Sequence, residues 1–311
     1  MAEESVLITG GAGFIGRALV GVCLAHGRRV GVYDNLRNGR AEHLVPYRES
    51  IAFFESDIRD GTALDCAFET FRPDSVIHLA ALHFIPYCNT HPAETLDVNV
   101  TGTYLLLDTC ARHGVRNVVF ASSGALYPGK ARPLEEDQDV PTPEDVYGLS
   151  KLLGEQTCRH FVATGGLSCR VARLFNTYGP FETNPHVLPT ILQQLHSGNT
   201  LELGNLHSKR DYIYVEDTAE ALYSLCLLEQ VGFDVYNVGT GQEYSVQELV
   251  DLIAKLTGRR LNVVQSTTRI RKTDKHHQIA NRSKVYARTG FKARIGIEEG
   301  LQKLLLADGL L

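Results

Sequence analysis

Short apolar runs alternate with longer amphipathic segments through the first half of this chain. The runs are rich in Val, Ile, Phe and Leu, so we expect strands that are buried on both faces. The alternation itself is typical of repeated βαβ units around a parallel sheet. The expected strands are Val6 to Thr9, Arg29 to Tyr33, Ala52 to Glu55, Ser75 to Ala80, Asn117 to Ser122 and Ser168 to Leu174.

Apolar residues at helical spacing fill the segments between these strands. Three of the expected helices end where a glycine can cap them, at Gly27, Gly114 and Gly165. The second half of the chain is less regular. The expected helices are Phe14 to His26, Pro92 to His113, Val146 to Thr164, Leu188 to His196, Val215 to Leu228, Val246 to Leu256 and Ile297 to Leu306, with further strands at Leu201 to Leu203 and Val235 to Val238.

The expected fold is therefore α/β, a Rossmann-type doubly wound parallel sheet with a smaller C-terminal substrate lobe. The first predicted domain, residues 1–175, binds a dinucleotide, and the second, residues 176–311, binds substrate. The chain contains no internal repeat and no Pro- or Ser-rich linker. We therefore expect interleaved lobes, with some segments around residues 211–238 returning to the first domain.

Composition narrows the class of partner. The chain has 311 residues and a formal net charge of −5, without the basic excess that favours nucleic acid or an anionic membrane surface. No apolar stretch approaches the roughly 20 residues of a membrane-spanning helix, and the acidic start does not resemble a secretory signal. The seven cysteines include no C-x-x-C pair, so we expect reduced thiols, a cytoplasmic location and no metal site.

A glycine-rich turn follows the first expected strand. Gly10, Gly13 and Gly16 form a G-x-x-G-x-x-G pattern, with Phe14 and Ile15 at the start of the next helix. Glycines there let the backbone approach a pyrophosphate, and the helix N-terminus offers N–H groups to it. A tight turn with close helix packing is the plainer alternative. The strand-turn-helix context favours dinucleotide binding.

An acidic residue ends the second expected strand. Asp34, with Asn35 beside it, can accept the adenosine ribose hydroxyls and would repel a 2′-phosphate, so NAD is predicted rather than NADP. Arg37 and Arg40 could instead hold a 2′-phosphate, and Asp34 could simply cap a turn. After the third strand, Asp57 and Ile58 are candidates to hold the adenine.

One tyrosine of the thirteen has a lysine four residues later. Tyr147 and Lys151 therefore share a helix face, and a nearby ammonium favours the phenolate that a general base needs. An exposed amphipathic turn is the alternative interpretation. Ser123, at the end of the fifth expected strand, favours the catalytic interpretation because its hydroxyl can bind the same substrate oxygen as Tyr147.

These residues, taken together, resemble the extended short-chain dehydrogenase/reductases, specifically the NAD-dependent nucleotide-sugar epimerase/dehydratase family and its UDP-glucose 4-epimerase-like branch. The resemblance implies bound NAD, a nucleoside-diphosphate sugar, and commonly a homodimer formed through a four-helix contact. It spans nearly the whole chain and rests on Gly10/Gly13/Gly16, Asp34, His78 to Ala81, Asn99, Ser122 and Ser123, Tyr147/Lys151, Arg173 to Pro180, Arg210 to Asp217 and Asn237 to Gly241.

Further roles follow from the resemblance by position. It assigns Asn176 and Arg210 to the substrate diphosphate, and it matches Arg271 and Asp274 to later phosphate and ribose contacts, although surface ion pairs and turn caps are alternatives. The residues after the His-Leu-Ala-Ala segment should face the sugar, namely His83, Phe84, Tyr87 and Cys88. His78 is expected to be a satisfied strand-end histidine. The resemblance also places four residues against the cofactor, namely Leu79, Ala80, Ala81 and Asn99.

The family's reactions differ in what meets the 4-keto sugar intermediate. The Asp-Glu pair of 4,6-dehydratases is absent after Ser123, and Ala125 replaces the cysteine typical of 3,5-epimerases. The resemblance therefore favours C4 epimerisation with transient, bound NADH. A 4-keto-sugar reductase using NADH or NADPH and, less favoured, a non-catalytic NAD-binding protein are the alternatives. The sugar remains open, as does the base, which is guanine, uracil or thymine.

Overall fold

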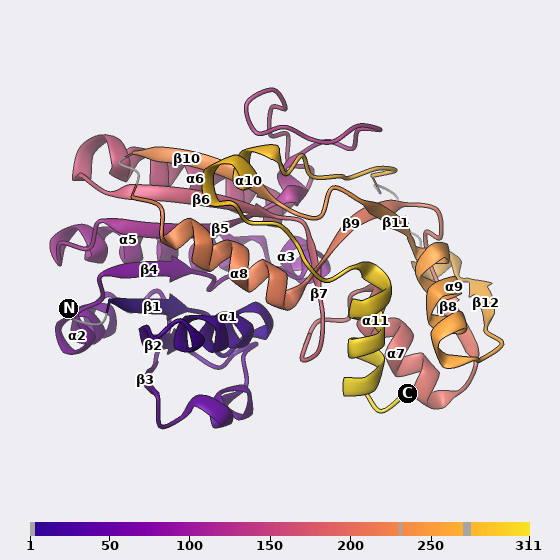
Figure 1. The fold of residues 1–311 in the computed structure, drawn as a ribbon. Coiled ribbons are helices and arrows are strands. Elements are labelled where there is room, and N and C mark those ends of the chain that lie inside the picture. Colours follow the sequence, from indigo (N-terminus) through magenta and orange to yellow (C-terminus); the bar gives the residue numbers. More distant parts are fainter. Residues whose placement is uncertain (1–3, 230–231, 270–274) are drawn as a thin grey trace.

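The computed structural model describes residues 4–229, 232–269 and 275–311, and a parallel sheet forms its centre (Figure 1). Within these ranges the sheet has seven strands in the order β10-β6-β5-β4-β1-β2-β3, and neighbouring strands are parallel. This order confirms the predicted α/β fold of the Rossmann type. The strands are β1 (Ser5–Thr9), β2 (Arg29–Asp34), β3 (Ile51–Glu55), β4 (Ser75–His78), β5 (Asn117–Ser123), β6 (Ser168–Leu174) and β10 (Phe233–Val238).

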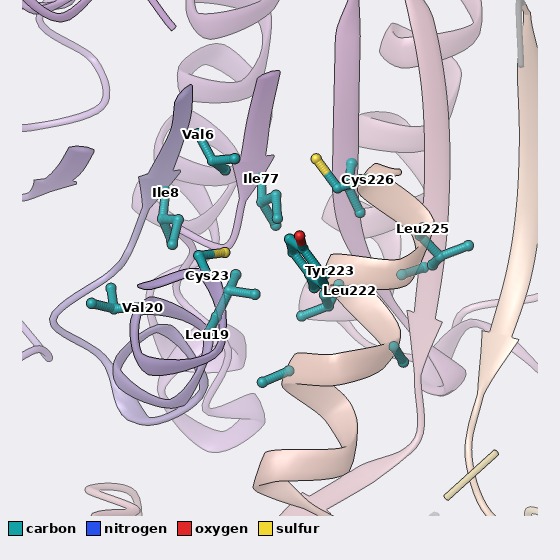
Figure 2. Close-up of a cluster of buried hydrophobic side chains, with 14 of the residues drawn as sticks. Val6, Ile8, Leu19, Val20, Cys23, Ile77, Leu222, Tyr223, Leu225 and Cys226 are labelled. Atoms are coloured by element: carbon teal, nitrogen blue, oxygen red, sulfur yellow. The ribbon is translucent and has the colours of Figure 1, made fainter. Parts of the chain in front are cut away.

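Helices cover both faces of the sheet because its strands are apolar on both sides. On β1, Val6 and Ile8 pack with α1 (Phe14–Ala25) and α8 (Val215–Cys226), as Figure 2 shows. Leu7 points to the opposite face and joins a second cluster. The helices on that face are α2 (Gly61–Phe71), α5 (Gly102–Arg112) and α6 (Val146–Gly165).

The helix expected over Pro92 to His113 is interrupted. It consists of α4 (Pro92–Leu96), a π-helical turn η2 (Asp97–Thr101) and α5, and a short helix α3 (Ile85–Thr90) precedes it. The apolar spacing continues across the π turn, so the sequence pattern does not reveal it. Such turns are frequent at functional sites.

Three local predictions were wrong. Strand β3 is at the edge of the sheet and is not buried on both faces, since Phe53 is 39% exposed. Helix α6 includes Gly165, and Gly166, with φ +68°, provides the left-handed cap. Strand β4 ends at His78, so the next residues belong to a loop that approaches the glycine-rich turn.

The C-terminal lobe is built on two small sheets. Within the described residues, β7 (Asn176–Tyr178), β9 (Lys209–Tyr214) and β11 (Glu243–Ser245) form one, and β8 (Thr200–Leu203) with β12 (Asn262–Gln265) forms the other. Its helices are α7 (Val187–Ser197), α9 (Val246–Thr257) and α11 (Ile297–Ala307), and they share an apolar cluster. The remaining elements are η1 (Ala41–Tyr47), η3 (Gly124–Leu126), η4 (Thr267–Arg269) and α10 (Ser283–Thr289).

The chain returns to the large sheet after β9. Helix α8 packs against α1, and β10 pairs with β6, whereas β9 belongs to a small sheet. The elements that return are therefore α8 and β10, which lie within residues 211–238. The division into domains at residue 175 stays a prediction. None of the helices within the described ranges has the length and apolarity needed to span a lipid bilayer.

Candidate active site and cofactor cleft

A cleft of about 840 Å³ lies at the carboxyl ends of the parallel strands, and residues of the small lobe form its other wall. Open parallel sheets bind ligands at this end. Asp57 and Asn99 do not line the cleft, and Arg271 and Asp274 lie outside the described residues. The other predicted site residues do line it: Gly10, Gly13, Phe14, Ile15, Gly16, Asp34, Asn35, Ile58, Leu79, Ala80, Ala81, His83, Ser123, Tyr147, Lys151, Asn176 and Arg210.

The glycine-rich turn forms one wall of the cleft, between β1 and α1. Gly10 has φ +73°, and a Cβ there would lie 2.8 Å from the amide nitrogen of Ala80. A Cβ on Gly16 would collide with the carbonyl oxygen of Gly10. In this described turn no side chain caps α1 at Gly13, so the first N–H groups of the helix remain available as donors. The turn fits the pyrophosphate of NAD, since a helix N-terminus favours an anion.

Asp34 ends β2 beside this turn and is buried. Its carboxylate accepts hydrogen bonds from the backbone N–H groups of Ala12, at 3.0 Å, and Leu36, at 2.8 Å. Burial raises the pKa of this carboxyl, and the two N–H groups oppose the rise. Asp34 therefore closes the turn, as a cap would, and also lines the cleft, where an acceptor fits the ribose hydroxyls of NAD.

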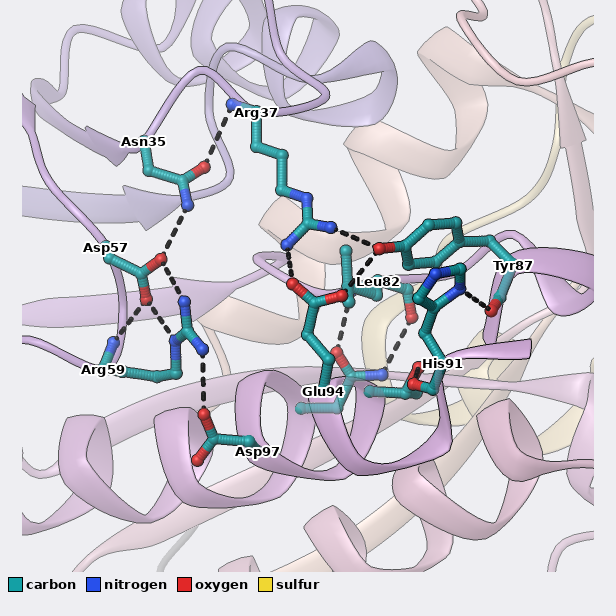
Figure 3. Close-up of polar contacts among 11 residues, drawn as sticks. Asn35, Arg37, Asp57, Arg59, Leu82, Tyr87, His91, Glu94 and Asp97 are labelled. Carbon is teal, nitrogen blue, oxygen red and sulfur yellow. Dashed lines mark hydrogen bonds and ion pairs between the residues drawn. The ribbon is translucent and has the colours of Figure 1, made fainter. Parts of the chain in front are cut away.

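Two polar networks extend from the loop after β2, and the Arg37 N–H joins them by donating a hydrogen bond to Asn35 Oδ1 at 3.1 Å (Figure 3). In the first, the Arg37 guanidinium forms an ion pair with Glu94 and donates a hydrogen bond to the Tyr87 hydroxyl at 2.7 Å. In the second, Asn35 donates to Asp57 at 2.9 Å, and Arg59 bridges Asp57 to Asp97. The two networks tie β2 and β3 to the helices that follow β4.

Asp57 is committed to the second network. Arg59 binds its carboxylate through the side chain and the backbone N–H, and these contacts hold its pKa well below the usual range. The residue positions Asn35, which lines the cleft. Asp57 therefore supports a neighbour that lines the cleft, and its own predicted contact with adenine stays a prediction.

Asn99 lies on the π turn η2 and is 2% exposed. Its Oδ1 accepts from the Leu82 N–H at 2.8 Å, and its Nδ2 donates to the Leu82 carbonyl at 2.8 Å and to the Ser150 hydroxyl at 2.9 Å. The side chain therefore joins the loop after β4 to α6 and does not reach the cleft. Asn99 is thus a positioning residue, and its predicted contact with the cofactor stays a prediction.

The predicted catalytic side chains converge from β5 and α6. Helix α6 begins at Val146 because the Asp145 carboxylate caps it, accepting from the Gly148 N–H at 2.7 Å. This start places Tyr147 and Lys151 one turn apart on the cleft side. Ser123 ends β5 and is 8% exposed, and its hydroxyl accepts a hydrogen bond from the Ala125 N–H at 3.1 Å. It lies close enough to the Tyr147 phenol to affect the pKa of that phenol.

Burial is the main influence on the pKa values of Tyr147 and Lys151. Burial raises the pKa of Tyr147 to about 12, although the hydrogen bond with Ser123 lowers it in part. Burial also lowers the pKa of Lys151 to about 8. In the protein without NAD, loss of solvation therefore dominates the pKa of the phenol. The expected lowering by the Lys151 ammonium together with the cationic nicotinamide ring stays a prediction for the NAD complex.

A buried ion pair fixes the strand that carries Ser123. Arg173 on β6 binds the Glu155 carboxylate through two nitrogens, at 2.9 and 2.7 Å, and Glu155 accepts from the Ser122 hydroxyl at 2.5 Å. Arg173 also donates to the Tyr127 hydroxyl at 2.6 Å. The bidentate geometry offsets the cost of burying two charges. The ends of β5 and β6 are thereby held at the cleft floor.

The wall near His83 contains groups that the sequence did not reveal. Asn184 Nδ2 donates to His83 Nε2 at 2.8 Å, and His186 lies 3.5 Å from the buried Glu182 carboxylate. Burial lowers the pKa of His83 to about 4, so this ring is neutral at pH 7. Their only sequence signal is position, because the segment directly follows the Arg173 to Pro180 motif.

Carboxylates also line the cleft, which the absence of acids after Ser123 did not anticipate. Glu182 pairs with His186, Asp145 caps α6, and Glu144 is exposed. Two of the three thus already have protein partners. His78, by contrast, is satisfied as predicted, since Thr9 and Thr103 bond its two nitrogens at 2.6 and 2.9 Å.

Cationic groups gather at the small-lobe end of the cleft. Arg210 on β9 donates to the Lys275 carbonyl at 2.6 Å, and Asn176 begins β7 with an exposed side chain. Lys275 itself donates to the carbonyls of Ala125, at 2.7 Å, and Tyr127. The sequence predicted Arg210 and Asn176 but not Lys275, whose segment has no periodic pattern.

A model of the NAD dependent epimerase/dehydratase family matches residues 6–239. The chain belongs to this family. UDP-glucose 4-epimerase 4 of Oryza sativa subsp. japonica is 32% identical over 329 residues, covering 96% of this chain and 88% of the relative. GDP-6-deoxy-D-mannose reductase of Pseudomonas aeruginosa is 32% identical over 243 residues, covering 75% of this chain and 79% of the relative.

The solved structures agree with this family. UDP-glucose-4-epimerase of Stenotrophomonas maltophila, with bound NAD and formylated UDP-arabinopyranose, has a TM-score of 0.92 and 27% identity, covering 99% of this chain and 98% of the other. The resemblance to the epimerase/dehydratase family, the Rossmann-type fold and NAD as cofactor are thereby confirmed. The relatives of this epimerase/dehydratase include an epimerase and a reductase, so the family alone does not select the reaction.

Proposed function

We propose that this protein is an NAD-dependent 4-epimerase of a nucleoside-diphosphate sugar, with a UDP-sugar as the favoured substrate. The observation that carries the proposal is the convergence of Ser123, Tyr147 and Lys151 in a cleft that also contains Asn176 and Arg210. The first three suit oxidation of a carbinol, and the last two suit a diphosphate. The UDP-sugar preference rests on the substrates named for the similar epimerases.

Tyr147, Ser123 and Lys151 have separate roles in this reaction. Tyr147 receives the proton of the sugar hydroxyl as the carbinol becomes a ketone, and returns it to the alkoxide when the carbinol forms again. Ser123 holds the reacting oxygen, because its hydroxyl lines the same cleft as the phenol and is near enough to affect the pKa of Tyr147. Lys151 adds positive charge beside the phenol, which favours the phenolate during turnover.

NAD, when bound, supplies the acceptor and donor of the hydride. Asp34 and the turn through Gly10 and Gly13 would hold its ribose and pyrophosphate. Lys151 would also contact the nicotinamide ribose. Net epimerisation requires that the ketone present its opposite face, and it requires no acid or base beyond Tyr147.

The alternative reaction, reduction of a 4-keto sugar, is favoured by one observation, the likeness to a GDP-6-deoxy-D-mannose reductase. The two functions differ in stoichiometry. A reductase consumes one nicotinamide cofactor for each product, whereas an epimerase needs no added cofactor once loaded.

We also propose that the protein forms a homodimer through α5 and α6. Tyr104 on α5 is 49% exposed, and Leu149 and Leu153 on α6 are 41% and 39% exposed. The two leucines are four residues apart and share a helix face. Two helices from each subunit would bury these apolar side chains in a four-helix contact.

The test is conversion of UDP-sugars in D₂O without added cofactor. The expected result is interconversion of C4 epimers with no deuterium at C3 or C5, because the proposed path breaks only the C4–H and O–H bonds. Deuterium at C3 or C5 would show that a cleft carboxylate or histidine enolises the ketone. No conversion of UDP-sugars, together with oxidation of added NADH or NADPH by a 4-keto nucleotide sugar, would favour the reductase.

A further inference from the structure

Arg37 occupies an unusual place in the cofactor cleft. It lies three residues after Asp34, on the loop that follows β2, and it lines the cleft. Arg40, the other arginine of this loop, does not line the cleft. Within the described loop, Arg37 is therefore the side chain with the charge and reach to bind an adenosine 2′-phosphate, a group that an arginine fork suits.

The guanidinium of Arg37 is held by two side chains from beyond β4. Glu94 on α4 forms the ion pair, Tyr87 on α3 accepts a hydrogen bond at 2.7 Å, and Tyr87 donates to Glu94 at 2.6 Å. His91 stacks on the Tyr87 ring, with centroids 4.1 Å apart and planes at 7°. Arg37, Glu94 and Tyr87 thus each contact the other two, and stacking against His91 holds the Tyr87 ring in place (Figure 3).

We propose that Glu94 and Tyr87 are specificity-determining residues that enforce the preference for NAD by keeping Arg37 from a 2′-phosphate. Asp34 disfavours NADP by repelling the 2′-phosphate. Glu94 disfavours it in a second way, because its charge neutralises Arg37, the cation next to Asp34 in the described cleft wall. Glu94 and Tyr87 thus weaken the binding of NADP without contacting NAD.

The physical basis is the balance of charge around the 2′ position. A guanidinium paired with a carboxylate offers little attraction to a further anion, whereas a released guanidinium offers a full charge and two parallel donors. Arg37 and Glu94 are 35% and 33% exposed, so solvent screens the pair only in part and the arginine can swing toward the cleft when released. The same release leaves Asp34 and its two backbone bonds in place.

The experiment compares Glu94→Gln with Asp97→Asn as a matched control. Asp97 begins η2, directly after α4, and pairs with Arg59. It does not line the cleft. The full chain is equilibrated with equal concentrations of NAD and NADP, and the bound nucleotides are then released by heat and quantified by chromatography. Removal of one unit charge from a half-exposed site should raise the bound NADP:NAD ratio about tenfold in Glu94→Gln. Asp97→Asn should leave the ratio unchanged.

A double variant identifies the residue responsible. Adding Arg37→Gln to Glu94→Gln should return the ratio to the wild-type value, because the released guanidinium is the proposed phosphate ligand. An unchanged ratio in Glu94→Gln would overturn the proposal. A gain that persists in the double variant would also overturn it, since the effect would then come from the lost negative charge alone. Tyr87→Phe, which removes the second contact, should raise the ratio in the same direction as Glu94→Gln.

Discussion

The ammonium nitrogen of Lys151 lies 6.0 Å from the centroid of the Tyr147 ring, one turn further along α6. It lies closer, at 5.0 Å, to the ring of Phe120 on β5, which forms the apolar floor beneath the helix. The lysine is 4% exposed. A buried ammonium between two rings keeps its charge at a cost, which the lowered pKa of Lys151 reflects. The raised pKa of Tyr147 reflects burial of the phenol itself.

Replacing Tyr147 by Phe should abolish most of the activity without unfolding the protein. The change keeps the ring and removes the group that carries the proton, so kcat should fall by about 10² to 10⁴. The amount of NAD that copurifies should stay the same. Tyr286→Phe, at a 56% exposed position on α10, is the matched control and should retain wild-type kcat. A fully active Tyr147→Phe variant would remove Tyr147 from the mechanism.

Replacing Lys151 by Met should stabilise the cofactor-free protein at pH 7 while it lowers kcat. The folded pKa of about 8 lies below the ordinary value of 10.5, so below pH 8 the native state carries a buried charge that the variant lacks. The gain should be about 3 kcal/mol of unfolding free energy at pH 7.

The stability gain of Lys151→Met depends on pH. Between pH 8 and 10.5 the unfolded wild type binds more protons at Lys151 than the folded one, so wild-type stability rises with pH across this window. The advantage of Lys151→Met should therefore shrink over the same interval in urea unfolding curves. A variant that is less stable than wild type at pH 7 would show that the ammonium contributes net stabilising contacts.

Arg210→Ala should raise KM for the nucleotide sugar much more than it lowers kcat. Truncating one side of a desolvated charge pair costs about 2 to 5 kcal/mol, and the diphosphate would be left with Asn176 and the remaining cations. Lys209→Ala is the control, because Lys209 precedes Arg210 on β9 but pairs with Glu248 and does not line the cleft. Equal KM values in wild type and Arg210→Ala would place this arginine outside the substrate site.

Leu153→Asp should convert the proposed homodimer to a monomer. A buried carboxylate at the four-helix contact would lack a partner, and its desolvation opposes association. Light scattering coupled to size exclusion measures the mass directly. Leu306→Asp on α11, at a position that is 55% exposed, should leave the mass unchanged. A wild-type protein that is already monomeric would contradict the proposal.

The sequence predicted the parallel sheet because its strands carry strong, local signals. Leu7, Ile77 and Val119 lie in apolar runs long enough to identify β1, β4 and β5, and each is buried. The small lobe was harder to predict. Strand β9 overlaps the motif Arg210 to Asp217, whose charged and polar residues obscure the alternation of a strand.

Part of the candidate site could be predicted from the sequence, and part depends on contacts that only the fold creates. Ser123, Tyr147 and Lys151 were accessible because helical spacing and a strand end place them with little reference to the rest of the chain. The partners of Arg37 were not accessible, since Glu94 is 57 residues away and meets it only through the fold. Likewise, the pKa of Tyr147 depends on burial, which residue spacing does not report.

The return of α8 and β10 to the large sheet has a consequence for biosynthesis. Strand β6 leaves its outer edge unpaired until Val238 has left the ribosome, so the nascent chain carries an open, apolar edge for more than sixty residues of synthesis. α1 likewise waits for Leu222 to cover its apolar side. A fragment that stops at residue 175 should therefore aggregate, and chaperones that shield strand edges should engage this protein during that interval.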